Sequence, residues 1–164
     1  MRHLVRLALL LSLLLLAAVP AGAVEWKSWN AGLASASASR RPVLVDVYTD
    51  WCRWCKQMDR EVYGRADVSQ YLAAKFVTVK LNAESSEPVS YRGRNLTARS
   101  LASSFDVSGY PTTIFLAPNG DHLANVPGYI EPGRFLLLLR YVGDGHMDRG
   151  VKWDDYVKRS GERR

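Results

Sequence analysis

Apolar residues along this chain fall into short β-branched runs separated by stretches with helical spacing. The runs VLVDVYT (43–49) and FVTVKLNA (76–83) are almost continuously apolar, which is typical of strands buried on both faces. TTIFLAP (112–118) and HLANVPG (122–128) are two further predicted strands. The Asn-Gly pair at 119–120 between them favours a tight antiparallel turn.

Between these strands, apolar residues recur at the three- and four-residue spacing of amphipathic helices. The first helix is expected within 25–39, where Trp26 and Trp29 begin an apolar face. The polar segment 87–97 has no such period and is expected to be an exposed loop. The other predicted helices lie at 52–63, 67–75, 98–107, 131–143 and, as a short last helix, 152–159.

The order of these elements predicts an α/β fold. Strand–helix–strand crossovers give parallel strand pairs, whereas the Asn-Gly turn gives an antiparallel pair. We therefore expect a mixed central sheet flanked by helices on both faces. The chain has 164 residues and no internal repeat, which is the size of one domain.

The first residues have the layout of a secretory signal peptide. Basic MRHLVR is followed by the apolar run LALLLSLLLLAAV and then by small residues, with Ala21 and Ala23 placed for cleavage. We expect a signal peptide at 1–23 and an exported, periplasmic domain at 24–164 with a short C-terminal extension. A retained anchor is the alternative, because the uncharged run 7–24 has 18 residues, the lower limit for a membrane span.

The charge pattern argues against a nucleic-acid partner. The formal net charge is +6, and loss of Arg2 and Arg6 with the signal lowers it to +4. Basic residues are dispersed along the chain, apart from the terminal KRSGERR, which is expected to be a solvated end.

The only two cysteines, Cys52 and Cys55, are separated by two residues, a spacing that fits a zinc half-site, a structural disulfide or a redox dithiol. A disulfide across so short a loop adds little stability. A structural zinc site needs four ligands, and His122 and His146, the histidines of the mature chain, do not form a closely spaced pair. Redox chemistry is therefore the leading interpretation, with no metal and no cofactor.

Cys52 follows the first predicted strand and opens the next helix. A helix N-terminus has unpaired N–H groups and a positive dipole end, which stabilise a thiolate. We therefore expect Cys52 to be the exposed, attacking sulfur. Cys55, one turn further along, would resolve the mixed disulfide.

The ordered set of motifs around this pair resembles the thioredoxin family. VDVYTDWCRWCK has an aspartate six residues before the first cysteine and a tryptophan directly before it, here Asp46 and Trp51. VKLN contains a lysine, Lys80, at the place of a family lysine near that aspartate, and VSGYPTTIFLAPNG is similar to the cis-proline strand and turn, with Tyr110 and Pro111. The resemblance covers about 42–142 and implies the thioredoxin fold.

The resemblance also implies roles for these residues. Asp46 would assist proton transfer at the resolving cysteine, with Lys80 as its modulating partner; the alternatives are a surface acid on an edge strand and a solvated lysine. Burial in an apolar strand should raise the pKa of Asp46. A cis bond before Pro111 would present the backbone of Tyr110 to a substrate strand, although an ordinary turn proline also fits.

The residues next to the cysteines suggest a protein-binding surface. Trp51 and Trp54 are expected to form an exposed apolar collar, with Arg53 between them. The alternative is that either tryptophan covers the core. We assign Trp51, Arg53, Trp54, Tyr110 and Pro111 to substrate binding.

Several features depart from ordinary thioredoxin. Arg53-Trp54 replaces Gly-Pro, and Arg60 stands where the family often has a kinking proline, so a straighter helix is expected. Segment 83–99 is longer than usual, and a tail follows Gly143. With the export signal, the last two features resemble periplasmic thioredoxin-like proteins of the SoxW type.

The function implied is an exported thiol–disulfide oxidoreductase. It would act as a monomer that reduces disulfides in periplasmic proteins, with electrons from an inner-membrane thiol reductase. A disulfide-forming oxidant is the alternative within this enzyme class. A non-catalytic binding module or chaperone is the alternative from another class.

Overall fold

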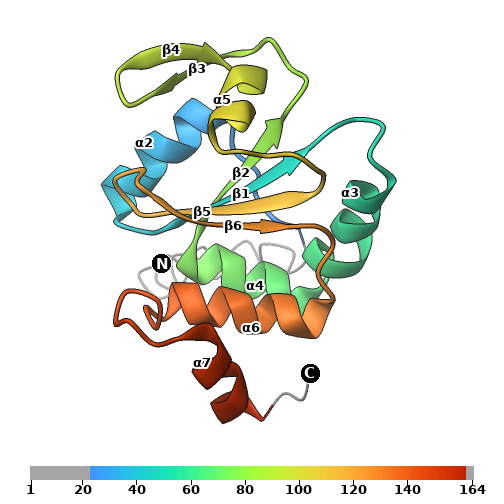
Figure 1. Ribbon diagram of the computed structural model, residues 1–164, viewed down its shortest axis with the longest axis vertical. Helices are drawn as coiled ribbons and strands as arrows, with labels where there is room; N and C mark the ends of the chain where they lie inside the picture. Colours follow the sequence, from blue (N-terminus) through green and yellow to red (C-terminus); the bar gives the residue numbers. More distant parts are fainter. Residues whose placement is uncertain (1–22, 162–164) are drawn as a thin grey trace, which may run out of the picture.

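The computed structural model of this chain describes residues 23–161, which form a mixed sheet between two layers of helices (Figure 1). The sheet has the order β2-β1-β5-β6. β1 pairs with β2 in parallel and with β5 antiparallel, and β5 pairs with β6 antiparallel, so the predicted α/β arrangement is confirmed. The strands are β1 (Val43–Tyr48), β2 (Val77–Asn82), β5 (Thr112–Leu116) and β6 (His122–Pro127).

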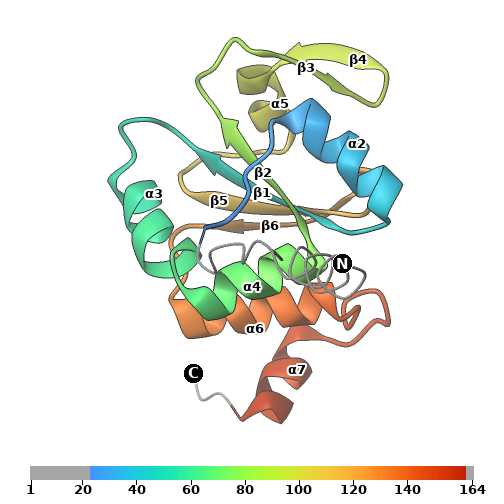
Figure 2. The same cartoon turned by 180° about the vertical axis from the view of Figure 1, so that it is seen from behind.

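Two apolar cores lie on opposite faces of the sheet, because successive residues of β1 point to opposite sides. Val43 and Val45 pack with α2 and α5, whereas Leu44 packs with α4 and α6 (Figures 1 and 2). The helices are α2 (Trp29–Ser39), α3 (Arg53–Met58), α4 (Ala66–Lys75), α5 (Ala98–Ser104), α6 (Pro132–Gly143) and α7 (Trp153–Ser160).

The first helix is shorter than predicted, because Trp26 lies outside it. Lys27 N–H donates to Thr78 O, and Lys27 O accepts from Lys80 N–H, so this residue forms a parallel bridge along the outer side of β2. The backbone is committed to the sheet there, and α2 begins only at Trp29. The Trp26 ring instead packs edge-on against Tyr63, at 4.8 Å between centroids.

Segment 87–97 is a β-hairpin and not the predicted exposed loop. β3 (Pro88–Tyr91) pairs antiparallel with β4 (Arg94–Thr97). Arg92 and Gly93 connect them with φ values of 49° and 75°, the positive values that a two-residue hairpin turn requires. Buried Val89 joins the core, and Trp29 Nε1 donates to Ser90 O at 3.0 Å, so the hairpin covers α2.

The helix after the cysteines is not the continuous helix that the absence of proline suggested. α3 ends at Met58 and passes into a π-helical turn, η1 (Asp59–Tyr63), which contains Arg60. Gly64 N–H donates to Asp59 O at 3.0 Å, the five-residue spacing of a π-helix. An extra residue in the turn, and not a proline, therefore interrupts the α-helix at this point.

The predicted last helix, α7, is confirmed. Tyr141 of α6 holds α7 in place. The centroid of the Tyr141 ring lies 5.2 Å from that of Trp153 and 5.3 Å from that of Tyr156, and the Tyr141 hydroxyl donates to Val151 O. Within 23–161, the structure has no helix with the length and hydropathy of a membrane span. Nearly all of the predicted signal peptide lies outside the described residues.

Candidate functional site

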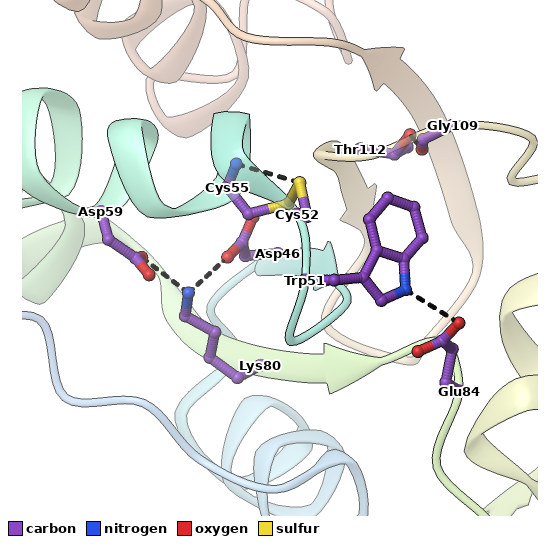
Figure 3. Close-up of a disulfide and its surroundings, with 9 residues drawn as sticks. All are labelled: Asp46, Trp51, Cys52, Cys55, Asp59, Lys80, Glu84, Gly109 and Thr112. Carbon is purple, nitrogen blue, oxygen red and sulfur yellow. Dashed lines mark hydrogen bonds and ion pairs between the residues drawn. A yellow bond between two sulfur atoms is a disulfide. The ribbon is translucent and has the colours of Figure 1, made fainter.

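Cys52 and Cys55 form a disulfide between the end of β1 and the start of α3, with their Cα atoms 5.3 Å apart (Figure 3). Cys52 is the N-cap residue of α3, and its Sγ accepts a hydrogen bond from the Cys55 N–H at 3.0 Å. The sulfur of Cys52 thus occupies the place of an N-cap oxygen, where a negative charge is stabilised by the helix N-terminus.

The prediction that Cys52 is the exposed sulfur is wrong for this oxidised form. Cys52 and Cys55 are each only 3% exposed. The disulfide joins residues within one helical turn, so both sulfurs lie in the same buried surroundings. What distinguishes them is the hydrogen bond to Cys52 Sγ and not solvent access.

Asp46 lies in the central strand β1 and is 1% exposed, which excludes the surface acid. Its register partner on β2 is Lys80, whose Nζ lies 2.7 Å from Asp46 Oδ2. Lys80 is not a freely solvated lysine, because its side chain is only 20% exposed and lies over the rings of Trp26 and Tyr48. Two residues that the sequence singled out therefore form one buried ion pair (Figure 3).

Asp59 is a member of this group that the sequence analysis missed. Its Oδ1 accepts a hydrogen bond from Lys80 Nζ at 2.6 Å. The ammonium is thus directed at Asp59, and the two oxygens of Asp46 receive no well-directed hydrogen bond among the described residues. The sequence signal for Asp59 is its position one helical turn after Cys55.

Burial and charge act in opposite directions on this group. Burial raises the pKa of Asp46, and the Lys80 ammonium offsets part of that rise. Burial alone would lower the pKa of Lys80, but Asp46 and Asp59 outweigh it and the Lys80 pKa lies above its ordinary value. The predicted rise in the Asp46 pKa is confirmed, and the pair can hold or release a proton beside the disulfide.

The two tryptophans beside the cysteines are exposed, as predicted, at 65% for Trp51 and 54% for Trp54. Trp51 Nε1 donates to Glu84 Oε1 at 3.0 Å (Figure 3). Its ring packs edge-on against Tyr110, with the ring centroids 6.0 Å apart. The ring of Trp54 packs against that of Tyr129, with the centroids 5.6 Å apart. Glu84 and Tyr129 were not predicted, since both come from connections that show no periodic pattern.

The remaining predicted residues surround the same place. Arg53 is exposed at the first position of α3. The Tyr110–Pro111 peptide bond is cis, and Pro111 O accepts from Gly128 N–H at 2.7 Å. Tyr110 is half-buried and contacts Trp51. The structure thus gathers all nine predicted site residues around the disulfide or the ion pair.

Comparison with known proteins identifies a family and several relatives that this chain resembles. The family described as "Thioredoxin-like domain" matches residues 29–143. The thiol:disulfide interchange protein DsbD of Yersinia pestis (strain Pestoides F) is 30% identical over 107 residues, covering 64% of this chain and 16% of that protein. DsbD of Ralstonia nicotianae is 36% identical over 107 residues, with coverages of 65% and 16%. This chain thus spans about one sixth of the length of these relatives.

Among solved structures, a thioredoxin from Thermus thermophilus superposes with a TM-score of 0.63 and 27% identity. The superposition covers 78% of this chain and 93% of that one.

Proposed function

Because this chain belongs to the thioredoxin-like domain family and has the thioredoxin fold, we propose that it is an exported thiol–disulfide oxidoreductase that reduces disulfides in periplasmic proteins. The observation that carries the proposal is the Cys52–Cys55 disulfide at the start of α3, with the Asp46–Lys80 ion pair beside it (Figure 3). A non-catalytic binding module would not require a disulfide at a helix N-terminus with a buried ion pair beside it.

In the reduced protein, the Cys52 thiolate attacks one sulfur of a substrate disulfide. A Cys52–substrate disulfide forms, the substrate's own S–S bond breaks, and its other sulfur leaves as a thiolate that takes a proton from water. The Cys55 thiolate then attacks Cys52 Sγ, which forms the internal disulfide and releases the second substrate thiolate. Two electrons pass to the substrate, and the Cys52–Cys55 pair is oxidised.

The residues around the disulfide support both steps. The Cys55 N–H, which donates to Cys52 Sγ, stabilises negative charge on the attacking sulfur. Asp46 accepts the proton of the Cys55 thiol before the second step, and the rise in its pKa on burial makes it a stronger base. Lys80 acts through Asp46, because its ammonium favours the charged carboxylate.

The substrate surface in this proposal is the collar of Trp51, Arg53 and Trp54 together with Tyr110 and Pro111. Aromatic side chains exposed beside a nucleophile provide contact area for a partner protein. In this proposal the signal at 1–23 directs export, and its cleavage releases a monomeric domain at 24–164. An inner-membrane thiol reductase would return electrons to the Cys52–Cys55 pair.

The narrower assignment to the SoxW type belongs to the same proposal. It rests on the export signal, the longer 83–99 segment and the tail after Gly143. The reductive direction rests on the resemblance to thioredoxin.

Reduction of insulin by dithiothreitol tests the activity. The 24–164 protein should accelerate precipitation of the insulin B chain, and Cys52→Ala should not. Equal rates for wild type, Cys52→Ala and buffer would instead indicate a binding module. Equilibration with glutathione buffers tests the direction, and a potential near the value of thioredoxin, about −270 mV, is expected for a reductant.

A further inference from the structure

A groove of about 570 Å³ lies between the end of β6, helix α6 and the segment after Gly143. Its volume is within the range of ligand-binding pockets. Glu131 and Arg134 are exposed along it, and the Arg134 guanidinium lies 5.8 Å from the ring centre of Trp153. The walls are mainly apolar and consist of Val126, Pro127, Ile130, Leu138, Met147 and Trp153. We refer to it as the extension groove.

The C-terminal extension supplies one wall of this groove. The family match ends at residue 143, whereas Met147 and Trp153 lie beyond it. Tyr141 fixes this wall, because its ring contacts Trp153 and its hydroxyl donates to Val151 O. A domain that ended at 143 would lack this side of the groove.

The extension groove borders the redox site at Tyr129. Tyr129 lines the groove, and its ring also packs against Trp54, next to the cysteines. Pro127 lines the groove and is the register partner of Thr112, which directly follows Pro111. The Gly128 N–H to Pro111 O bond holds this connection in place. The groove and the collar of tryptophans therefore meet at Tyr129.

We propose that the extension groove binds a large apolar side chain, such as leucine or phenylalanine, from the substrate segment that flanks the reacting cysteine. The inference rests on the proposed function. A substrate that reaches Cys52 brings its flanking residues to this end of the groove, which raises their effective concentration there. The apolar walls favour an apolar side chain, because burial there removes its surface from water. Glu131 and Arg134 are exposed along the groove, so the polar backbone of the substrate can stay in contact with water.

Two synthetic peptides test this with the wild-type protein. Each peptide carries one cysteine in a mixed disulfide with glutathione. The apolar peptide has the pair Leu-Phe next to that cysteine, and the polar peptide has Ser-Ser at the same two positions. We expect the reduced protein to reach half-maximal single-turnover rate at a roughly tenfold lower concentration of the apolar peptide, equivalent to ~1.4 kcal/mol. Equal half-maximal concentrations would overturn the inference.

Oxidised glutathione separates the two proposals in the same experiment. If the wild type exchanges with oxidised glutathione and with both peptides equally, the extension groove is not a substrate site but the proposed function stands. If the reduced protein exchanges with no disulfide, the proposed function fails and this inference fails with it.

A matched pair of variants locates the effect. Met147→Glu places a charge in the groove wall and should abolish most of the preference for the apolar peptide. Leu136→Glu makes the same kind of change at another half-buried position of the α6–α7 layer, which lines a separate hollow, and should keep the preference. Equal loss in both folded variants would contradict the inference, as would a dimer in sedimentation that Met147→Glu alone dissociates. The peptide comparison with wild type decides the matter if either variant does not fold.

Discussion

Asp46 and Lys80 face each other as register partners on parallel strands, with Lys80 Nζ 2.7 Å from Asp46 Oδ2. The lysine is shared, because its hydrogen bond goes to Asp59 Oδ1 at 2.6 Å. The buried carboxylate thus depends on a cation that a second, more exposed carboxylate also binds. Substitutions at Asp46 and Asp59 should therefore change the stability of the protein and the titration of Asp46.

Asp46→Asn should stabilise the oxidised protein near pH 7, by roughly 1–3 kcal/mol, because a neutral amide replaces a buried carboxylate charge whose desolvation the Lys80 ammonium only partly offsets. Burial raises the Asp46 pKa above its unfolded value, so the folded wild type takes up a proton first as the pH falls. As the pH falls from that raised pKa to about pH 3.8, the stability of the wild type therefore increases. The stability advantage of Asp46→Asn over the wild type should shrink across the same pH range. Urea unfolding between pH 4 and 8 measures this, with exposed Asp121→Asn as the control; no gain at pH 7 would contradict it.

Asp59→Asn should lower the pKa of Asp46. The Asp59 charge raises that pKa, and its loss also leaves Lys80 free to direct its hydrogen bond to Asp46. NMR titration of the Asp46 carboxyl carbon measures the shift. Glu61→Gln is the matched control, because Glu61 lies on the same π-helical turn but bonds to Gln57 and Tyr129. An Asp46 titration that moves equally in both variants would exclude a specific role for Asp59.

Cys55→Ser should accumulate mixed disulfides with substrate proteins through Cys52, since attack remains possible and resolution does not. Cys52→Ser should trap almost none. Non-reducing electrophoresis of tagged variants from the periplasm makes the comparison. Stronger trapping by Cys52→Ser would reverse the roles of the two cysteines.

Arg53→Gly should make the Cys52–Cys55 couple more reducing. The guanidinium follows Cys52 directly and favours its thiolate, which exists only in the reduced form. Arg53 is exposed, so we expect a shift well below the ~30 mV that corresponds to ~1.4 kcal/mol. Bulk from Trp54 could oppose this effect by desolvating the sulfur, but its ring packs against Tyr129.

Equilibration with glutathione buffers measures the potential of Arg53→Gly beside wild type. Arg53→Lys keeps the charge and should retain most of the wild-type value. A potential for Arg53→Gly that is unchanged or less negative would falsify tuning through the thiolate.

The exported protein should begin at Val24. Cleavage after Ala23 follows from the small residues at 21 and 23, which fit the A-x-A pattern. Mass spectrometry of the protein from a periplasmic extract measures the mature N-terminus. Recovery of Met1 or Arg2 in a membrane fraction would indicate the retained anchor instead.

The sequence predicted the sheet well because its strands carry strong patterns. The almost continuous apolar runs at 43–49 and 76–83 correspond to β1 and β2, and the Asn-Gly turn corresponds to the β5–β6 connection. The β3–β4 hairpin was missed because only Val89 is buried in it, so alternation is too short to detect. The start of α2 was misplaced because Lys27 pairs with β2 across a distance in sequence that no local pattern reveals.

Site residues were predicted where they lie in motifs that resemble those of the family and missed where only tertiary contacts bring them in. Cys52, Trp51 and Asp46 lie within seven residues of one another in the sequence. Asp59 and Tyr129 enter through the π-helical turn and through the loop after β6, respectively. The burial of Cys52 was not foreseen, since a position at a helix start does not fix how much solvent reaches the sulfur.

The outer edge of β6 bears on self-association. Backbone N–H groups of an antiparallel strand alternate between its two sides, and that of Gly128 points inward to Pro111 O. The preceding position would point its donor outward, but Pro127 has none. The free edge of the sheet is therefore interrupted at Pro127, whose register partner Thr112 directly follows the cis-proline Pro111. Edge-to-edge aggregation between copies of the protein should be disfavoured at that place.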